Sequence, residues 1–170
     1  RQVTIGTDTF KLEEPFLVIA TQNPIEHEGT YRLPEAQLDR FLFKINVGYP
    51  NLSQEFEIIK NQHENRFEDK TDAVQKVISG TQLKTYQNLV KDVVVETQLL
   101  EYIAKIIVNT RENQFLYLGA SPRASLALLT ASKSFAAVRG RDFVTPEDIK
   151  EASYAVLRHR VMVSPEREME

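Results

Sequence analysis

The sequence predicts an α/β segment followed by a bundle of helices, so that helix predominates overall. Short apolar runs typical of strands concentrate before residue 50, whereas beyond it apolar residues recur at the spacing of one helix face. The composition supports a folded chain, since 42% of the residues are hydrophobic and 26% are charged, as in globular proteins.

The first 20 residues predict two strand features. At residues 3–12, apolar residues alternate on both sides of the turn sequence Gly-Thr-Asp-Thr, which predicts a β-hairpin. Residues 16–20 form a continuous apolar run, Phe-Leu-Val-Ile-Ala, after a proline. Such a run predicts a strand that is buried on both faces, as in a parallel sheet.

A polar loop is expected at residues 25–33, followed by a short helix at residues 34–40. This helix has proline in its first turn. Glu35 lies near its start and Arg40 near its end, where the helix dipole favours an anion and a cation respectively.

Residues 41–47 predict a second strand, and the sequence Gly-Tyr-Pro-Asn that follows it is typical of a break between elements. We place a domain boundary at this break. The sequence therefore predicts an α/β domain at residues 1–50 and a helical domain at residues 51–170.

Apolar spacing predicts four helices in the second domain, at residues 52–64, 81–91, 96–111 and 122–139. The third is the clearest, because Leu100, Ile103, Ala104 and Ile107 lie on one helix face.

Gly140 is expected to end the fourth helix. A fifth helix is predicted to begin after Thr145, which acts as N-cap, with Pro146 at the first helical position. Residues 159–163 predict a last short strand.

Composition excludes several classes of protein. The net charge of -3 and the pI near 5.7 give no electrostatic case for a surface that coats DNA, and we expect no nucleic-acid partner. The chain has no cysteine, which excludes disulfides and thiolate metal sites and is compatible with the cytoplasm, where we expect the protein. The longest apolar run is residues 16–20, far too short for a membrane span. The three histidines lack metal-ligand spacing, so no metal site is expected.

Asn23 is the first candidate site residue. It follows the predicted strand at residues 16–20, and ligands of open α/β sheets bind beyond the carboxyl ends of strands. Its amide can donate and accept, so it could contact a phosphate oxygen or orient a water molecule. The alternative is an ordinary Asn-Pro turn.

Arg40 is the second candidate, at the end of the predicted short helix. A guanidinium there could act as an arginine finger, which stabilises charge on a transferred γ-phosphoryl group. The alternative is a salt bridge to a nearby carboxylate or a solvated side chain.

Arg123 is the third candidate. Ser121 and Pro122 read as N-cap and first helical position, so Arg123 lies at the positive end of a helix. A cation is disfavoured there by roughly 0.3–1 kcal/mol. An anion held at that end would make the placement of the cation favourable, and the helix amides and the guanidinium could then bind one phosphate together. The alternative is a side chain that turns into water.

A phosphate-binding loop is missing from the sequence. None of the six glycines is followed by lysine, as G-x-x-x-x-G-K-[ST] requires. The apolar run at residues 16–20 is followed by Thr-Gln rather than by Asp-Glu, the pair that would hold Mg²⁺. We therefore expect that these residues alone cannot hydrolyse ATP.

Three segments resemble the MoxR family of AAA+ ATPases. The first comprises FLVIATQNP at residues 16–24, EGTY at residues 28–31 and LPEAQLDRF at residues 33–41, in that order and spacing. The second is GASPRA at residues 119–124, and the third runs from Arg-Gly-Arg at residue 139 to Ile149.

The resemblance implies the second half of an AAA+ P-loop core followed by an all-α lid. It implies that Asn23 is the sensor 1 residue, Arg40 the arginine finger and Arg123 the sensor 2 residue in the lid. It also implies that the phosphate-binding loop and the acidic Mg²⁺ motif lie upstream of Arg1. Arg32 stands where the family usually has proline, which affects no candidate residue.

The resemblance further implies an ATPase that uses ATP and Mg²⁺ in its full-length form, with neither required by this part alone. Subunits would form a ring, as a hexamer, for chaperone-like remodelling of proteins or insertion of a metal cofactor. A protein with a von Willebrand factor A domain is the implied partner. Two other readings remain open: a non-catalytic protein-binding module, and a nucleic-acid-remodelling AAA+ branch such as the replicative helicases or the magnesium chelatase subunit.

Overall fold

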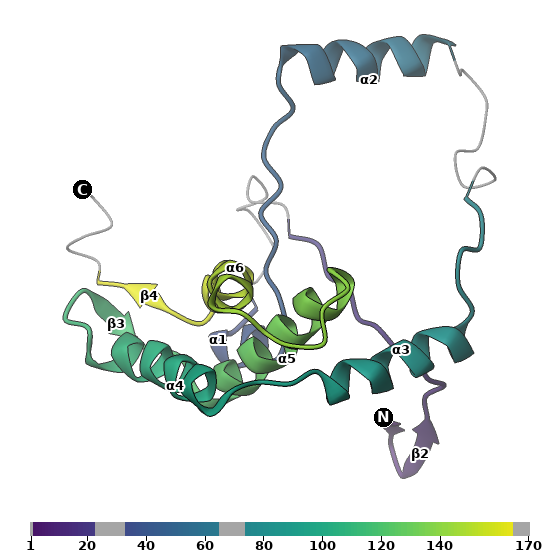
Figure 1. The fold of residues 1–170 in the computed structure, drawn as a ribbon. Helices are drawn as coiled ribbons and strands as arrows, with labels where there is room; N and C mark the ends of the chain where they lie inside the picture. Colours follow the sequence, from purple (N-terminus) through teal and green to yellow (C-terminus); the bar gives the residue numbers. More distant parts are fainter. Residues whose placement is uncertain (1, 23–32, 65–73, 165–170) are drawn as a thin grey trace.

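A computed structural model describes residues 2–22, 33–64 and 74–164 of the chain. Helix predominates, in the order that the sequence predicts (Figure 1). The elements are β1 (Gln2–Ile5), β2 (Asp8–Lys11), α1 (Glu35–Leu38), α2 (Leu52–Glu64), α3 (Gly80–Asp92), α4 (Thr97–Glu112), β3 (Leu116–Leu118), α5 (Pro122–Val138), α6 (Pro146–Leu157) and β4 (Met162–Val163).

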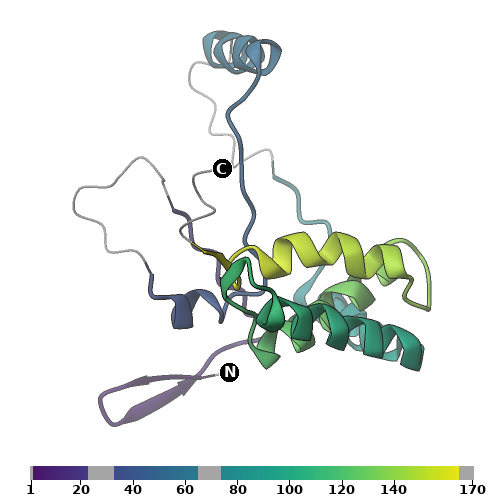
Figure 2. The same cartoon turned by 90° about the vertical axis from the view of Figure 1, so that its left-hand side faces the viewer.

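The core lies between α4, α5 and α6, which lie side by side in both views (Figures 1 and 2). Buried alanines on α5, among them Ala124 and Ala131, let its backbone approach the neighbouring helices closely. Leu128 of α5 and Ile149 and Val156 of α6 are fully buried. Each such side chain stabilises the fold by about 1.5–3 kcal/mol. The helical part therefore carries its own hydrophobic core.

The start of α6 is fixed by Asp148, whose side chain is fully buried. Its carboxylate accepts hydrogen bonds from the guanidinium groups of Arg139 (2.8 Å) and Arg141 (2.6 and 2.8 Å). The backbone N–H of Thr145 also donates to it, at 2.9 Å. The Arg141 hydrogen bond holds the pKa of Asp148 well below its usual range. Thr145 is the N-cap, as predicted. α5 ends at Val138, just before Gly140, which was expected to end it and has a positive φ of 72°.

A short antiparallel ladder joins β3 to β4. β4 lies within the strand predicted at residues 159–163, so that prediction is confirmed for its last two residues. β3 was not predicted, because three residues between two helices carry no recognisable alternation. The ladder ties the chain after α6 to the chain after α4.

The two longer strands predicted in the first domain are wrong for this structure. Residues 16–20 and 41–47 form no strand, and their side chains are largely exposed, with Ile19 at 80% and Val47 at 91%. Both runs have the residue types of strands, but a strand forms only where a second strand offers a ladder. Among the described residues, no strand lies beside either segment.

The hairpin of β1 and β2 is confirmed, with Val3 opposite Phe10 and Thr4 opposite Thr9. In both views α2 stands away from the other helices (Figures 1 and 2). The expected loop at residues 25–33 falls almost entirely outside the described residues. None of the described helices is long and apolar enough to cross a membrane.

Residues on the N-terminal side of the predicted boundary contact the helical core. The backbone N–H of Lys44 donates to Ala155 O of α6 at 2.9 Å, and Phe43 packs against the core. The boundary between residues 50 and 51 stays a prediction, but α1 and the residues after it lie on the helical part.

Candidate functional site

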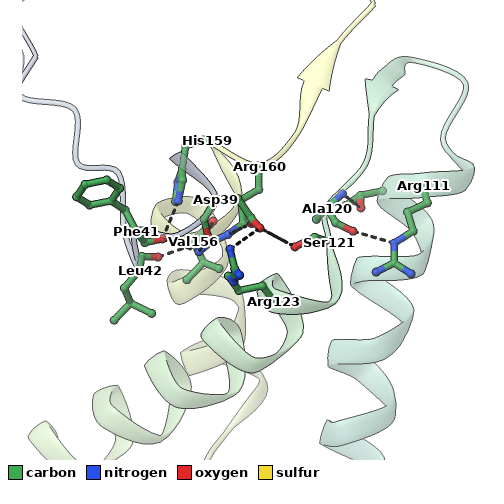
Figure 3. Close-up of polar contacts among 11 residues, drawn as sticks. Asp39, Phe41, Leu42, Arg111, Ala120, Ser121, Arg123, Val156, His159 and Arg160 are labelled. Carbon is green, nitrogen blue, oxygen red and sulfur yellow. Dashed lines mark hydrogen bonds and ion pairs between the residues drawn. The ribbon is translucent and has the colours of Figure 1, made fainter. Parts of the chain in front are cut away.

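The N-terminus of α5 is positioned by the end of α4. The backbone N–H of Ala120 donates to Thr110 Oγ1 at 2.9 Å, and Arg111 Nε donates to Ala120 O at 2.8 Å (Figure 3). Ala120 is fully buried. A Cβ on Gly119 would lie 2.6 Å from both Arg111 Cα and Thr110 O, so only glycine permits this approach. The sequence Gly-Ala-Ser-Pro-Arg thus sets where α5 begins.

An anion does lie at this helix end, and it is the carboxylate of Asp39. The hydroxyl of Ser121, the N-cap residue, donates to both Asp39 oxygens, at 3.2 and 3.0 Å. Arg123 Nη1 lies 3.3 Å from Asp39 Oδ2. The carboxylate therefore offsets the unfavourable placement of a cation at the positive end of α5. Asp39 follows directly after α1 and precedes Arg40.

A second arginine, Arg160, holds the same segment from the other side. Its side chain is only 2% exposed. Nε donates to Asp39 Oδ1 at 2.9 Å, Nη2 to Asp39 O at 3.0 Å and to Phe41 O, and Nη1 to Leu42 O at 3.1 Å and to Val156 O (Figure 3). All five N–H donors of the guanidinium are thus used. Burial lowers the pKa of Arg160, which the Asp39 hydrogen bond partly opposes.

His159 adds one more contact to this junction. Its Nε2 lies 3.1 Å from Phe41 O, and a carbonyl oxygen only accepts, so Nε2 carries the proton. Its Nδ1 is buried and makes no hydrogen bond among the described residues. Burial lowers the pKa of His159, which favours the neutral ring.

The structure bears on the three candidate residues unequally. Arg123 lies at the N-terminus of α5, as predicted, with its side chain 53% exposed. Arg40 is exposed just after α1, and its side chain has no polar partner among the described residues. Asn23 lies outside the described residues. The chain thus places Arg123 in contact with the immediate neighbour of Arg40.

The arrangement has the chemistry of an anion site. Ser121 and Arg123 already hold a carboxylate at the end of a 17-residue helix, and a phosphate offers the same acceptors. Arg123 uses one nitrogen on Asp39, so its other N–H donors remain for a ligand, and the side chain is more than half exposed. These residues fit a nucleotide phosphate. Among residues 2–22, 33–64 and 74–164, no group of side chains could hold a metal ion by itself.

The sequence did not identify Asp39 or Arg160 as functional residues. Asp39 was noted only within the LDRF motif, and Arg160 only as part of a predicted strand. The partners are 121 residues apart along the chain. No local pattern could indicate this pairing, because Arg160 directly follows Arg158 and His159 and nothing in the sequence distinguishes it from them.

Two family models match the chain. Residues 1–43 match the model described as ATPase family associated with various cellular activities (AAA), and residues 108–170 match the AAA lid domain. Residues 39–42 fall within the first match, and the residues that contact Asp39, namely Ser121, Arg123 and Arg160, fall within the second.

Individual relatives match almost the whole chain. Chaperone MoxR1 of Mycobacterium tuberculosis is 44% identical, over 96% of this chain and 45% of the relative. YeaC of Bacillus subtilis, an uncharacterized protein, is 40% identical, over 99% of this chain and 52% of the relative. A solved structure of a Cytophaga hutchinsonii protein assigned as an ATPase is 39% identical, with a TM-score of 0.86 over 99% of this chain and 53% of that chain. The chain spans about half the length of these relatives.

Proposed function

Because this chain belongs to the MoxR family of AAA+ ATPases, we propose that the full-length protein hydrolyses ATP between the subunits of a ring and remodels a partner protein. One observation carries the proposal. Arg40 and Arg123, the two arginines assigned to nucleotide chemistry, meet at Asp39: Arg123 pairs with its carboxylate and Arg40 follows it in the chain. One is unpartnered among the described residues and the other is weakly paired, so both are available to a phosphate.

Arg123 acts on a nucleotide phosphate as the sensor 2 residue. Its position at the N-terminus of α5 combines a guanidinium with the helix amides, and both favour an anion. The Ser121 hydroxyl is a further donor at the same place. A nucleotide phosphate would compete with Asp39 for these groups, so nucleotide binding changes what holds the lid.

Arg40 acts on the nucleotide of a neighbouring subunit. Its backbone is fixed through Asp39 and residues 41–42, whereas its side chain is exposed. A guanidinium held on a fixed backbone can stabilise the charge that develops on the γ-phosphoryl group without reorganisation. Asn23 serves as the sensor 1 residue, next to the γ-phosphate or the attacking water.

The remaining parts of the proposal concern the whole protein. The phosphate-binding loop and the acidic residues for Mg²⁺ lie in another part of it, and six subunits form the ring. Lid movement drives chaperone-like remodelling or insertion of a metal cofactor. A protein with a von Willebrand factor A domain is the partner, and the protein works in the cytoplasm.

Arg40→Ala in the full-length protein tests the role in trans. We expect ATP turnover to fall by about 10³-fold or more, as for other arginine fingers. ATP binding, measured by calorimetry, should change little because the residue belongs to the neighbour's site. An equal loss of binding and turnover would contradict the assignment.

Arg123→Ala tests the role of Arg123 in nucleotide binding. We expect weaker ATP binding, by about tenfold for the loss of a charge-assisted hydrogen bond. Arg123→Lys keeps the charge without the planar fork and should restore binding only in part. Binding and turnover that both equal those of the unchanged protein would leave Arg123 as a surface residue paired with Asp39.

A further inference from the structure

We propose that Arg160 is a positioning residue that fixes the backbone of the Arg40 segment to the lid, and so controls how Arg40 meets the neighbouring subunit's nucleotide. The proposal rests on the proposed role of Arg40 in trans. Arg160 lies outside the three residues that the family motifs indicate. Its role follows from where its five N–H donors go.

Four of those five donors reach the segment that contains Arg40. They bind the Asp39 carboxylate and the main-chain carbonyls of Asp39, Phe41 and Leu42 (Figure 3). These acceptors lie on both sides of Arg40 along the chain. The backbone on each side of the finger is therefore held by one rigid, planar group.

The fifth donor anchors that group to the lid. Arg160 Nη1 donates to Val156 O at the end of α6, and Val156 is fully buried in the helical core. The lid core, Arg160 and the Arg40 segment thus form one continuous contact. The backbone hydrogen bond from Lys44 to Ala155 extends it along α6.

Asp39 joins this contact to Arg123 at the N-terminus of α5. The same carboxylate accepts from Arg160, which is buried, and from Arg123, which is more than half exposed. When Arg123 leaves Asp39 for a phosphate, Arg160 keeps the Arg40 segment on the lid. Lid movement then carries Arg40 with it, so the position of the lid sets where Arg40 lies in the neighbouring subunit's site.

The test uses mixed rings of the full-length protein. Arg160→Met alone should lower kcat by about 10²-fold, the cost of a misplacement of about 1 Å, while KM for ATP changes little. Mixed with Asn23→Ala subunits, which lack the sensor 1 side chain in their own site but keep an intact Arg40, it should regain turnover. Mixed with Arg40→Ala subunits it should regain none, because both variants then supply a defective finger.

Three outcomes would overturn the proposal. Turnover of Arg160→Met equal to that of the unchanged protein, with only a lower Tm, would make Arg160 a structural residue. Rescue by Arg40→Ala, or failure of rescue by Asn23→Ala, would place the defect in the subunit's own site. Normal turnover of Arg40→Ala rings would instead refute the proposed function, which separates the two failures.

Arg160→Lys provides a second variant, should Arg160→Met fail to fold. Lysine keeps the buried charge opposite Asp39 but offers three donors in place of five. We expect turnover between that of Arg160→Met and that of the unchanged protein, with the same pattern of rescue. Turnover and rescue equal to those of the unchanged protein would show that the charge suffices and that positioning by the fork is unnecessary.

Discussion

Two arginines share the Asp39 carboxylate, but their different exposure gives the two ion pairs different contributions to the stability of the fold. The exposed pair with Arg123, at 3.3 Å, contributes about 0–1 kcal/mol to stability. Arg160 is buried, and removal of one partner from a buried pair costs about 3–5 kcal/mol. Asp39 therefore holds Arg160 firmly and leaves Arg123 free to exchange partners.

Gly119 is a second residue on which the site depends, because its lack of a side chain lets the start of α5 approach the end of α4 closely. Gly119→Ala would push a methyl group to 2.6 Å from backbone atoms of Thr110 and Arg111, so the start of α5 must shift. We expect the free energy of unfolding to fall by about 1–3 kcal/mol, the usual cost of overpacking. Urea denaturation measures the change.

Gly48→Ala is the matched control for this variant. A Cβ at Gly48 would meet nothing within 4 Å, and the backbone there has no positive φ. Its effect should stay within about 0.5 kcal/mol. If both variants lost the same stability, the close contact of Gly119 with α4 would not matter.

The placement of Arg123 at the start of a helix is confirmed, because the signal for it is local, while its role stays a prediction. Arg123 could be recognised because the N-cap serine, the proline and the arginine are consecutive in the sequence, and a cation is unfavourable at the start of a helix. Arg160 could not, because its acceptors lie at residues 39–42 and only the fold brings them together. A charge near an apolar stretch indicates a buried partner but not which one.

The start of α6 is the element whose stability depends most on one charge. Asp148 accepts from Arg139, Arg141 and Thr145, and these contacts hold its pKa below the unfolded value of about 3.9. A lowered carboxyl pKa stabilises the fold above the unfolded pKa, and this stabilisation is lost as the pH falls through the folded value. The loop before α6 should thus weaken in acid.

Asp148→Asn tests this dependence. At pH 7 we expect the free energy of unfolding to drop by about 3 kcal/mol, since two guanidinium groups lose their shared anion. The difference between the variant and the unchanged chain should shrink as the pH is lowered from 5 towards 2. Unfolding curves over that pH range measure it.

Asp142→Asn is the control, because Asp142 is exposed and lies in the same loop. Its substitution should change stability by at most about 0.5 kcal/mol at any pH in this range. A difference for Asp148→Asn that stayed constant with pH would show that the carboxylate's charge contributes nothing.

The predicted helices formed, whereas the strands predicted at residues 16–20 and 41–47 did not, and the reason is physical. The apolar stripe of α4 and the capping residues of α6 lie within the element that they specify. A strand depends on a partner elsewhere in the chain. Residues 16–20 have the right composition but no described ladder partner, whereas the three residues of β3 found one in β4.

At the scale of the whole molecule, apolar surface is distributed unevenly. Every buried residue among those described lies at residue 93 or beyond. Residues 16–20 and 41–47, by contrast, expose large apolar side chains in two segments. Contiguous exposed apolar surface promotes association, and extended backbone with unpaired groups adds to it.

We therefore expect the chain of residues 1–170 to self-associate through these segments as its concentration rises. Ile19→Lys combined with Val47→Lys should raise the monomer fraction in sedimentation velocity experiments. Both side chains are at least 80% exposed, so the unfolding free energy of the helical core should change by less than about 0.5 kcal/mol. Val138→Lys is the control, since Val138 is 87% exposed but lies at the end of α5. If that variant dissociated the oligomers equally well, net charge rather than the two segments would govern association, and a chain that is monomeric at every concentration would refute the prediction.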